Sequence, residues 1–99
     1  MIINQAKENG SIILAVSGEL TAITSEQLND AIKKAIEETN CLILDFKDLE
    51  YVASAGLRVL LQAKKLMDAR GGKFIVRQVC EAVMDVFEIT GFSDILVIQ

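Results

Sequence analysis

The feature that most constrains the fold is an alternation of short apolar runs with longer segments whose apolar residues recur at helical spacing. The runs 2–3 and 12–16 flank Asn9-Gly10, which is typical of a type I′ hairpin turn because both turn positions need positive φ. Gly18-Glu19-Leu20 then leads into a loop. A helical segment precedes each of three further strand-like runs, at 41–46, 73–76 and 95–98. The predicted order is therefore β-β-α-β-α-β-α-β, an α/β fold with a small mixed sheet that is largely parallel beyond the hairpin.

Each of the three predicted helices has recognisable boundaries. The first fits a capping box, with Thr24 as N-cap and Gln27 at the third helical position, and its apolar residues follow at helical spacing: Leu28, Ala31, Ile32, Ala35 and Ile36. The second begins at or just after Ser54 and runs to about Ala69, because Gly71-Gly72 stops it. The third ends at Gly91 and is marked by Val79, Val83, Val86 and Phe87.

Two patterns predict how these elements are buried. The run 41–46 is almost continuously apolar, as expected of a strand buried on both faces of a sheet. On a helical wheel at about 100° per residue, one arc of the second helix is predicted to face the sheet: Val59, Leu60, Ala63, Leu66 and Met67. Leu57 and Leu61 lie on the other arc, beside Ser54 and Arg58. This pair either packs on a neighbouring helix or forms an apolar docking surface, and the sequence supports these two interpretations equally.

Composition limits the class of protein. The length of 99 residues predicts one domain, residues 1–99, and a hydrophobic content of 52% is too high for a disordered chain. No apolar run approaches the roughly 20 residues that cross a bilayer, and the N-terminus does not resemble a signal peptide. We therefore expect a soluble, cytoplasmic protein without membrane insertion. A net charge of −4 disfavours nucleic acid and favours a protein partner.

The chemistry-bearing residues argue against most catalytic classes. Histidine is missing, which excludes hydrolases with a Ser-His-Asp relay, and no glycine-rich phosphate loop follows a strand. We expect no enzymatic activity and no cofactor. Cys41 and Cys80 are predicted to be reduced packing residues. Asp45, Asp48 and Glu50 could suggest Mg²⁺, but we favour a role in keeping their loop hydrated and predict no metal site.

Ser54 is the strongest candidate for a functional residue, because it stands where a strand and its loop turn into a helix. A helix start carries unpaired N–H groups and about half a positive elementary charge, which stabilise an anion such as phosphoserine. From the residues alone, Ser54 is either an N-cap, which we favour at this point, or a phosphorylation switch. Ala53 and Ala55 leave its hydroxyl accessible, and Gly56 allows another backbone to approach. Arg58, one turn on, either pairs with a phosphate or is a solvated helix residue.

Residues 44–60, with the sequence LDFKDLEYVASAGLRVL, resemble the signature of STAS domains, the family of bacterial anti-sigma factor antagonists. Gly18-Glu19-Leu20 and the segments 71–74 and 89–92 are similar to other landmarks of that family, so the resemblance covers essentially the whole chain. It implies a small sheet covered by helices, in agreement with the element order. It also implies that Ser54 is phosphorylated by a partner that is both anti-sigma factor and serine kinase.

The resemblance further implies a partner-switching cycle. The unphosphorylated protein would bind the anti-sigma factor and free a sigma factor, phosphorylation would break the complex, and a phosphatase acting on phosphoserine would restore it. The predicted partner-binding surface comprises Ser54, Ala55, Gly56, Leu57, Arg58, Leu61 and Thr21.

This sequence departs from the family's best-known pattern at three positions. Ala53 and Thr21 stand where aspartates are common, and Ala55 stands where a second hydroxyl residue often follows the serine, so the loop is less acidic here. Two alternative functions stay open. One is an unphosphorylated STAS subunit of a membrane assembly that transports lipids or anions, and the other is a nucleotide-binding STAS domain, for which the chain offers no phosphate loop.

Overall fold

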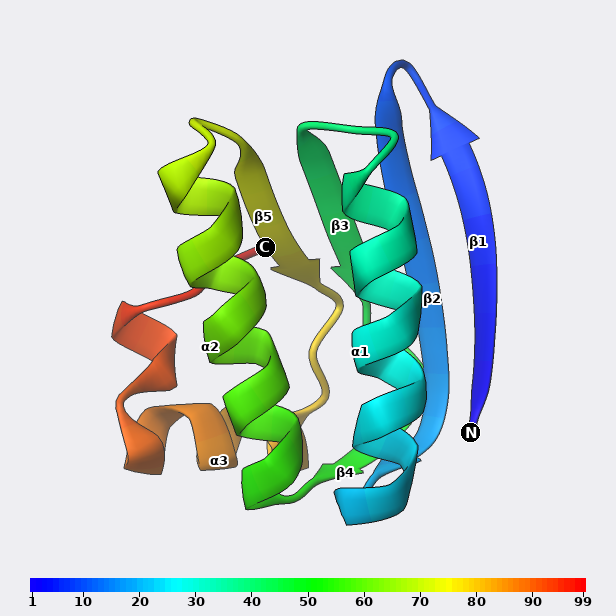
Figure 1. Ribbon diagram of the computed structural model, residues 1–99. Coiled ribbons are helices and arrows are strands. Elements are labelled where there is room, and N and C mark those ends of the chain that lie inside the picture. The colour runs from blue at the N-terminus through cyan, green and yellow to red at the C-terminus, as the bar shows by residue number, and fades with distance from the viewer.

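The computed structural model describes residues 1–99 and confirms the predicted N-terminal hairpin (Figure 1). Strand β1 (Ile2–Glu8) pairs antiparallel with β2 (Ser11–Leu20). The turn residues Asn9 and Gly10 have φ values of 52° and 85°, the left-handed conformations that a type I′ turn requires. The hairpin therefore rests on two adjacent residues that tolerate positive φ best.

The sheet continues in parallel beyond the hairpin, as the alternation of strands and helices predicts. Its strand order is β1-β2-β3-β5-β6, in which the last three strands are β3 (Cys41–Asp45), β5 (Lys73–Arg77) and β6 (Val97–Ile98). Each of these strands pairs parallel with its neighbour. The α/β class with a mixed sheet is confirmed. Strand β6 is shorter than predicted because the N–H groups of Ile95 and Leu96 donate to the carbonyl oxygen of Phe92, in the turn that follows the short 3₁₀ helix η1 (Phe92–Asp94).

A short strand that the sequence analysis missed, β4 (Leu49–Val52), lies between β3 and the second helix. It pairs parallel with the far end of β2 after a register shift between Gly18 and Glu19. Gly18 has a φ of 98°, and its N–H donates to the Asp48 carbonyl oxygen at 3.0 Å. Gly18-Glu19-Leu20 end β2 and hold β4, and the loop into which they were predicted to lead is the single residue Thr21. The observed order becomes β-β-α-β-β-α-β-α-β.

Helices α1 (Ala22–Ile36) and α2 (Ser54–Ala69) lie side by side over one face of the sheet, and α3 (Glu81–Thr90) lies on the side of α2 away from α1, near the start of α2 (Figure 1). The boundaries predicted for α2 and the stop at Gly91, which has a φ of 82°, are confirmed. The predicted N-cap of α1 is wrong. Thr21 is the N-cap, and Thr24 takes the third helical position of the capping box. The capping box therefore lies three residues before the predicted one, which paired Thr24 with Gln27.

The hydrophobic core lies between the sheet and the three helices. In β3, Leu42 and Leu44 are fully buried and face the helices, whereas Ile43 between them is half-buried. The expectation of a strand buried on both faces is therefore wrong, since the helices leave the other face of the sheet open. On that open face the register aligns one apolar row across four strands: Ile13, Ile43, Ile75 and Val97.

No helix is both long enough and apolar enough to span a membrane. Cys41 and Cys80 are free thiols, as predicted, and both are half-buried. The sulfur of Cys80 lies 3.3 Å from the carbonyl oxygen of Leu49, which ties the start of α3 to β4.

Candidate functional site

Strand β4 brings the starts of α1 and α2 together at one end of the sheet. Leu20 and Val52, the last residues of their strands, are paired, and the N–H of Ala53 donates to the Leu20 carbonyl oxygen at 2.8 Å. Thr21, the N-cap of α1, directly follows Leu20, and Ala53 is the N-cap of α2. The starts of α1 and α2 lie at the same end of the sheet (Figure 1). The predicted site residues Thr21 and Ser54, 33 positions apart in the sequence, stand at these two helix starts.

Ser54 is the first residue of α2 and is exposed to solvent. Its interpretation as the N-cap is wrong, because Ala53 occupies that position and supplies no side-chain hydrogen bond to the helix. The first turn of α2 also contains no acidic residue. The first N–H groups of α2 therefore have no side-chain cap and lie beside the exposed Ser54, which is an electrostatic setting that favours an anion on Ser54.

Gly56 is what allows α2 to lie this close to the ends of β2 and β4. A Cβ atom on this buried residue would stand 2.6 Å from the Cδ2 atom of Leu20 and 2.9 Å from the Cγ2 atom of Val52. Neither distance is tolerable for carbon atoms in contact. Gly56 therefore positions the site from within, while Ala55 and Leu57 on either side are half-buried. Leu57 packs against the core.

Thr21 uses its hydroxyl inside the capping box. Its oxygen accepts a hydrogen bond from the N–H of Thr24 at 3.2 Å, and its own N–H donates to the Thr24 hydroxyl oxygen at 2.7 Å. The Thr24 hydroxyl in turn donates to the Glu19 carbonyl oxygen at 2.7 Å. These bonds fix the start of α1 beside Ser54 and leave Thr21 half-buried at the rim of the site.

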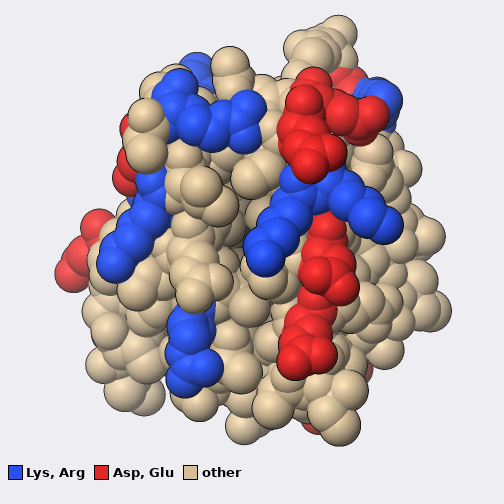
Figure 2. All heavy atoms as spheres, viewed as in Figure 1, with Lys and Arg blue, Asp and Glu red and all other residues tan.

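The rest of the predicted partner-binding surface lies along the outer side of α2. Arg58 is exposed and Leu61 is half-buried. Four of the five residues predicted to face the sheet are buried, but Leu66 is 45% exposed, so its assignment to the core is wrong. Figure 2 shows basic side chains along the α2 side of this face, whereas acidic side chains and lysines share the α1 side.

Two exposed apolar residues on the elements that flank Ser54 were not predicted as part of the site. Ile23, in the first turn of α1, is 84% exposed, and Tyr51, on β4, is 50% exposed. Tyr51 is paired with Glu19 across β2 and β4. A sequence signal for Ile23 did exist, since it lies outside the apolar stripe predicted for α1. Tyr51 gave none, because β4 was not predicted.

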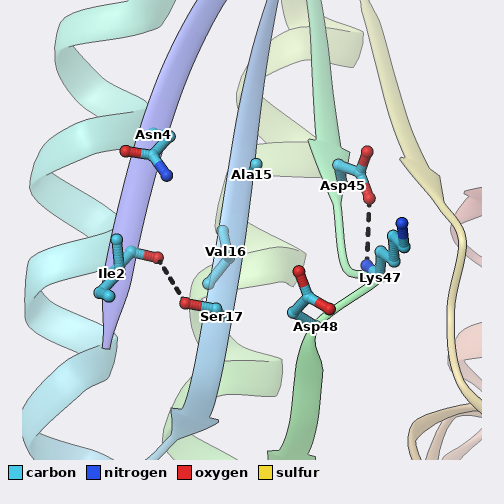
Figure 3. Close-up of a pocket in the computed structure, with 8 residues that line it drawn as sticks. All are labelled: Ile2, Asn4, Ala15, Val16, Ser17, Asp45, Lys47 and Asp48. Atoms are coloured by element: carbon cyan, nitrogen blue, oxygen red, sulfur yellow. Dashed lines mark hydrogen bonds between the residues drawn. The ribbon is translucent and has the colours of Figure 1, made fainter.

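The three carboxylates considered for Mg²⁺ do not converge on one point. Asp45 accepts hydrogen bonds from the Lys47 N–H at 3.0 Å and from the Arg77 Nε at 3.3 Å. Asp45 and Asp48 line a hollow of about 250 Å³ on the open face of the sheet, with the helices behind the strands (Figure 3). Glu50 does not line it and is exposed on β4.

This α/β fold, with an exposed serine at an uncapped helix start, defines a STAS-type domain. The STAS domain model matches residues 3–99, and the chain belongs to this family. The chain is 31% identical to an anti-sigma F factor antagonist of Paenibacillus polymyxa over 96 residues, which cover 95% of this chain and 82% of the relative.

Two solved structures share the fold. An anti-sigma factor antagonist from Mycobacterium paratuberculosis superposes with a TM-score of 0.88 at 22% identity, covering 99% of this chain and 84% of that one. The Bacillus cell fate determinant SpoIIAA in its phosphorylated form superposes with a TM-score of 0.76 at 20% identity, covering 99% and 91%.

Proposed function

We propose that this STAS domain acts as an anti-sigma factor antagonist and that Ser54 is its phosphorylation switch. The observation that carries the proposal is the position of Ser54, exposed and without a hydrogen bond at the uncapped start of α2. The Paenibacillus relative is an anti-sigma F factor antagonist, so the corresponding partner of this chain is an anti-sigma factor. A protein with the same fold has been solved in a phosphorylated form, which supports the switch.

The chain's own part in this cycle is non-catalytic. An anti-sigma factor with serine kinase activity transfers the phosphoryl group, and a phosphatase removes it. Ser54 only has to present its hydroxyl, and the half-buried methyl groups of Ala53 and Ala55 obstruct little of the space around it. The phosphate adds about −1.5 to −2 charges at neutral pH. In the free protein, the unpaired N–H groups at the start of α2 stabilise that charge. In the complex, the same charge would be buried in the interface with the partner, which destabilises the complex.

The partner surface in this proposal consists of exposed and half-buried residues around the two helix starts. Ser54 lies at its centre, Thr21 and Ala55 lie beside it, and Leu57, Arg58 and Leu61 extend it along α2. Gly56 contributes by positioning the helix, because it is buried against Leu20 and Val52. The curated relative favours antagonism over the transport-assembly alternative.

The proposal is tested by incubating the protein with ATP and a candidate anti-sigma factor that has serine kinase activity. Intact mass should show one added phosphate, and site mapping should place it on Ser54. Ser54→Ala should not be modified, and Leu57→Asp should weaken the complex. Equal phosphorylation of Ser54→Ala would show that the site is wrong. If no kinase modifies the wild-type protein and Leu57→Asp instead abolishes binding to a transporter, the alternative function is correct.

A further inference from the structure

The outward stripe of α2 carries positive charge that no other residue of the chain neutralises. On a helical wheel, Ser54, Arg58, Leu61 and Lys65 fall within an arc of roughly 60°. We call these four residues the α2 stripe. Next to it, Lys64 and Asp68 pair with each other at 2.9 Å. Arg58 and Lys65 take part in none of the ion pairs or side-chain hydrogen bonds of the structure.

The charge of this stripe is opposite in sign to the net charge of the whole protein, which is −4. The segment from α3 to η1 contains only acidic charges: Glu81, Asp85, Glu88 and Asp94. On α1, Glu26 and Asp30 are followed by Lys33 and Lys34, so neither sign prevails there (Figure 2). Arg58 and Lys65 are therefore two exposed, unpaired cations on α2 in a protein of opposite net charge. Arg58 lies one helical turn from Ser54, and the α2 stripe spans about 16 Å from Ser54 to Lys65 at the usual helical rise.

We propose that the α2 stripe docks on an acidic surface of the anti-sigma factor. This inference rests on the proposed function and adds the chemistry of the partner surface. Leu61, half-buried between two unpaired cations, supplies the apolar centre of a contact whose charged rim would steer and orient the partner. Thr21 and Ala53, the N-cap residues beside Ser54, carry no charge that would repel such a partner.

An acidic partner surface also gives phosphorylation two ways to break the complex. The phosphate on Ser54 would face the partner's carboxylates directly, and like charges repel strongly where water is excluded. The same phosphate lies one turn from Arg58, and side chains at this spacing meet on a helix surface. It therefore competes with the partner for the Arg58 guanidinium.

The experiment measures the affinity of the unphosphorylated protein for the anti-sigma factor at low and at physiological ionic strength. Arg58→Glu and Lys65→Glu should each weaken binding by about tenfold at low salt, and the loss should shrink as salt rises. Arg58→Gln should lie between Arg58→Glu and wild type. The matched control is Lys47→Glu, which makes the same change of charge on the exposed connection between β3 and β4 and should stay within about twofold.

The outcomes separate this inference from the function on which it rests. If Ser54 is phosphorylated and the wild type binds, but Arg58→Glu and Lys65→Glu bind as tightly, the acidic partner surface is wrong and the proposed function stands. An equal loss in Lys47→Glu also overturns the inference, because it would reveal only a general effect of net charge. A wild-type protein that is neither phosphorylated nor bound overturns both.

Discussion

The backbone N–H of Ala53 donates to the carbonyl oxygen of Leu20 at 2.8 Å, and this hydrogen bond joins the residues that precede α1 and α2. Leu20 ends β2 immediately before α1, and Ala53 follows β4 immediately before α2. The pairing brings two segments that are distant in the sequence together beside Ser54. It also makes the ends of β2 and β4 the part of the fold on which the site depends most.

Substitution of Gly56 by Ala tests whether the site requires the close approach of α2 to the ends of β2 and β4. The informative result is whether the free energy of unfolding rises or falls. Helix propensity alone predicts that Gly56→Ala stabilises the protein by about 1 kcal/mol. The new Cβ would stand 2.6 Å from Leu20, however, so we expect a net loss of about 1–3 kcal/mol and slower phosphorylation of Ser54. Urea denaturation measures the free energy of unfolding. A stabilised variant would show that the close approach of α2 to β2 is not required.

Much of the architecture could be predicted because it depends on local chemistry. Asn9-Gly10 specified the hairpin through φ preferences, and the glycines after α2 and α3 specified where those helices end. Strand β4 could not be predicted, since its four residues show no alternation and its only partner is the end of β2 beyond a bulge. The N-cap of α1 could not be assigned because Thr21 and Thr24 are chemically alike, and what distinguishes them is the extended backbone of Thr21 and the hydrogen bond from the Thr24 hydroxyl to the Glu19 carbonyl oxygen.

Loss of the Thr39 hydroxyl should destabilise the whole fold. Thr39 is 7% exposed, its hydroxyl donates to the Gly10 carbonyl oxygen at 2.6 Å, and its oxygen accepts from the Cys41 N–H at 3.0 Å. Thr39→Val keeps the shape but leaves both groups unpaired, which should lower the free energy of unfolding by about 1–3 kcal/mol. Thr90→Val is the control, because its hydroxyl lies at the exposed end of α3 and its loss should cost under about 0.5 kcal/mol. Equal losses in urea denaturation would contradict the prediction.

A carboxylate at position 21 should weaken partner binding without weakening the fold. Thr21→Asp and Thr21→Asn both keep a good N-cap for α1, so the free energy of unfolding should change by less than about 0.5 kcal/mol. Only the aspartate adds a negative charge beside Ser54. We therefore expect Thr21→Asp, but not Thr21→Asn, to lower the affinity for the anti-sigma factor at low salt. Tighter binding of Thr21→Asp would indicate a basic partner surface instead.

Ile23 should contribute to binding through its exposed side chain. It is 84% exposed in the first turn of α1, two residues after Thr21, whereas Ile89 is 86% exposed on α3. The two isoleucines therefore form a pair matched in exposure, and they differ in the helix that carries them. Ile23→Ser should reduce the affinity several-fold and Ile89→Ser should leave it unchanged, as measured by calorimetry. The reverse result would move the interface to α3.

The central claim is that a phosphate on Ser54 switches partner binding. The most direct test prepares the wild-type protein in unphosphorylated and Ser54-phosphorylated forms and measures the Kd of each for the same anti-sigma factor. We predict that phosphorylation weakens binding by at least about tenfold, or about 1.4 kcal/mol. Equal affinity of the two forms, with the phosphate mapped to Ser54, would contradict the claim.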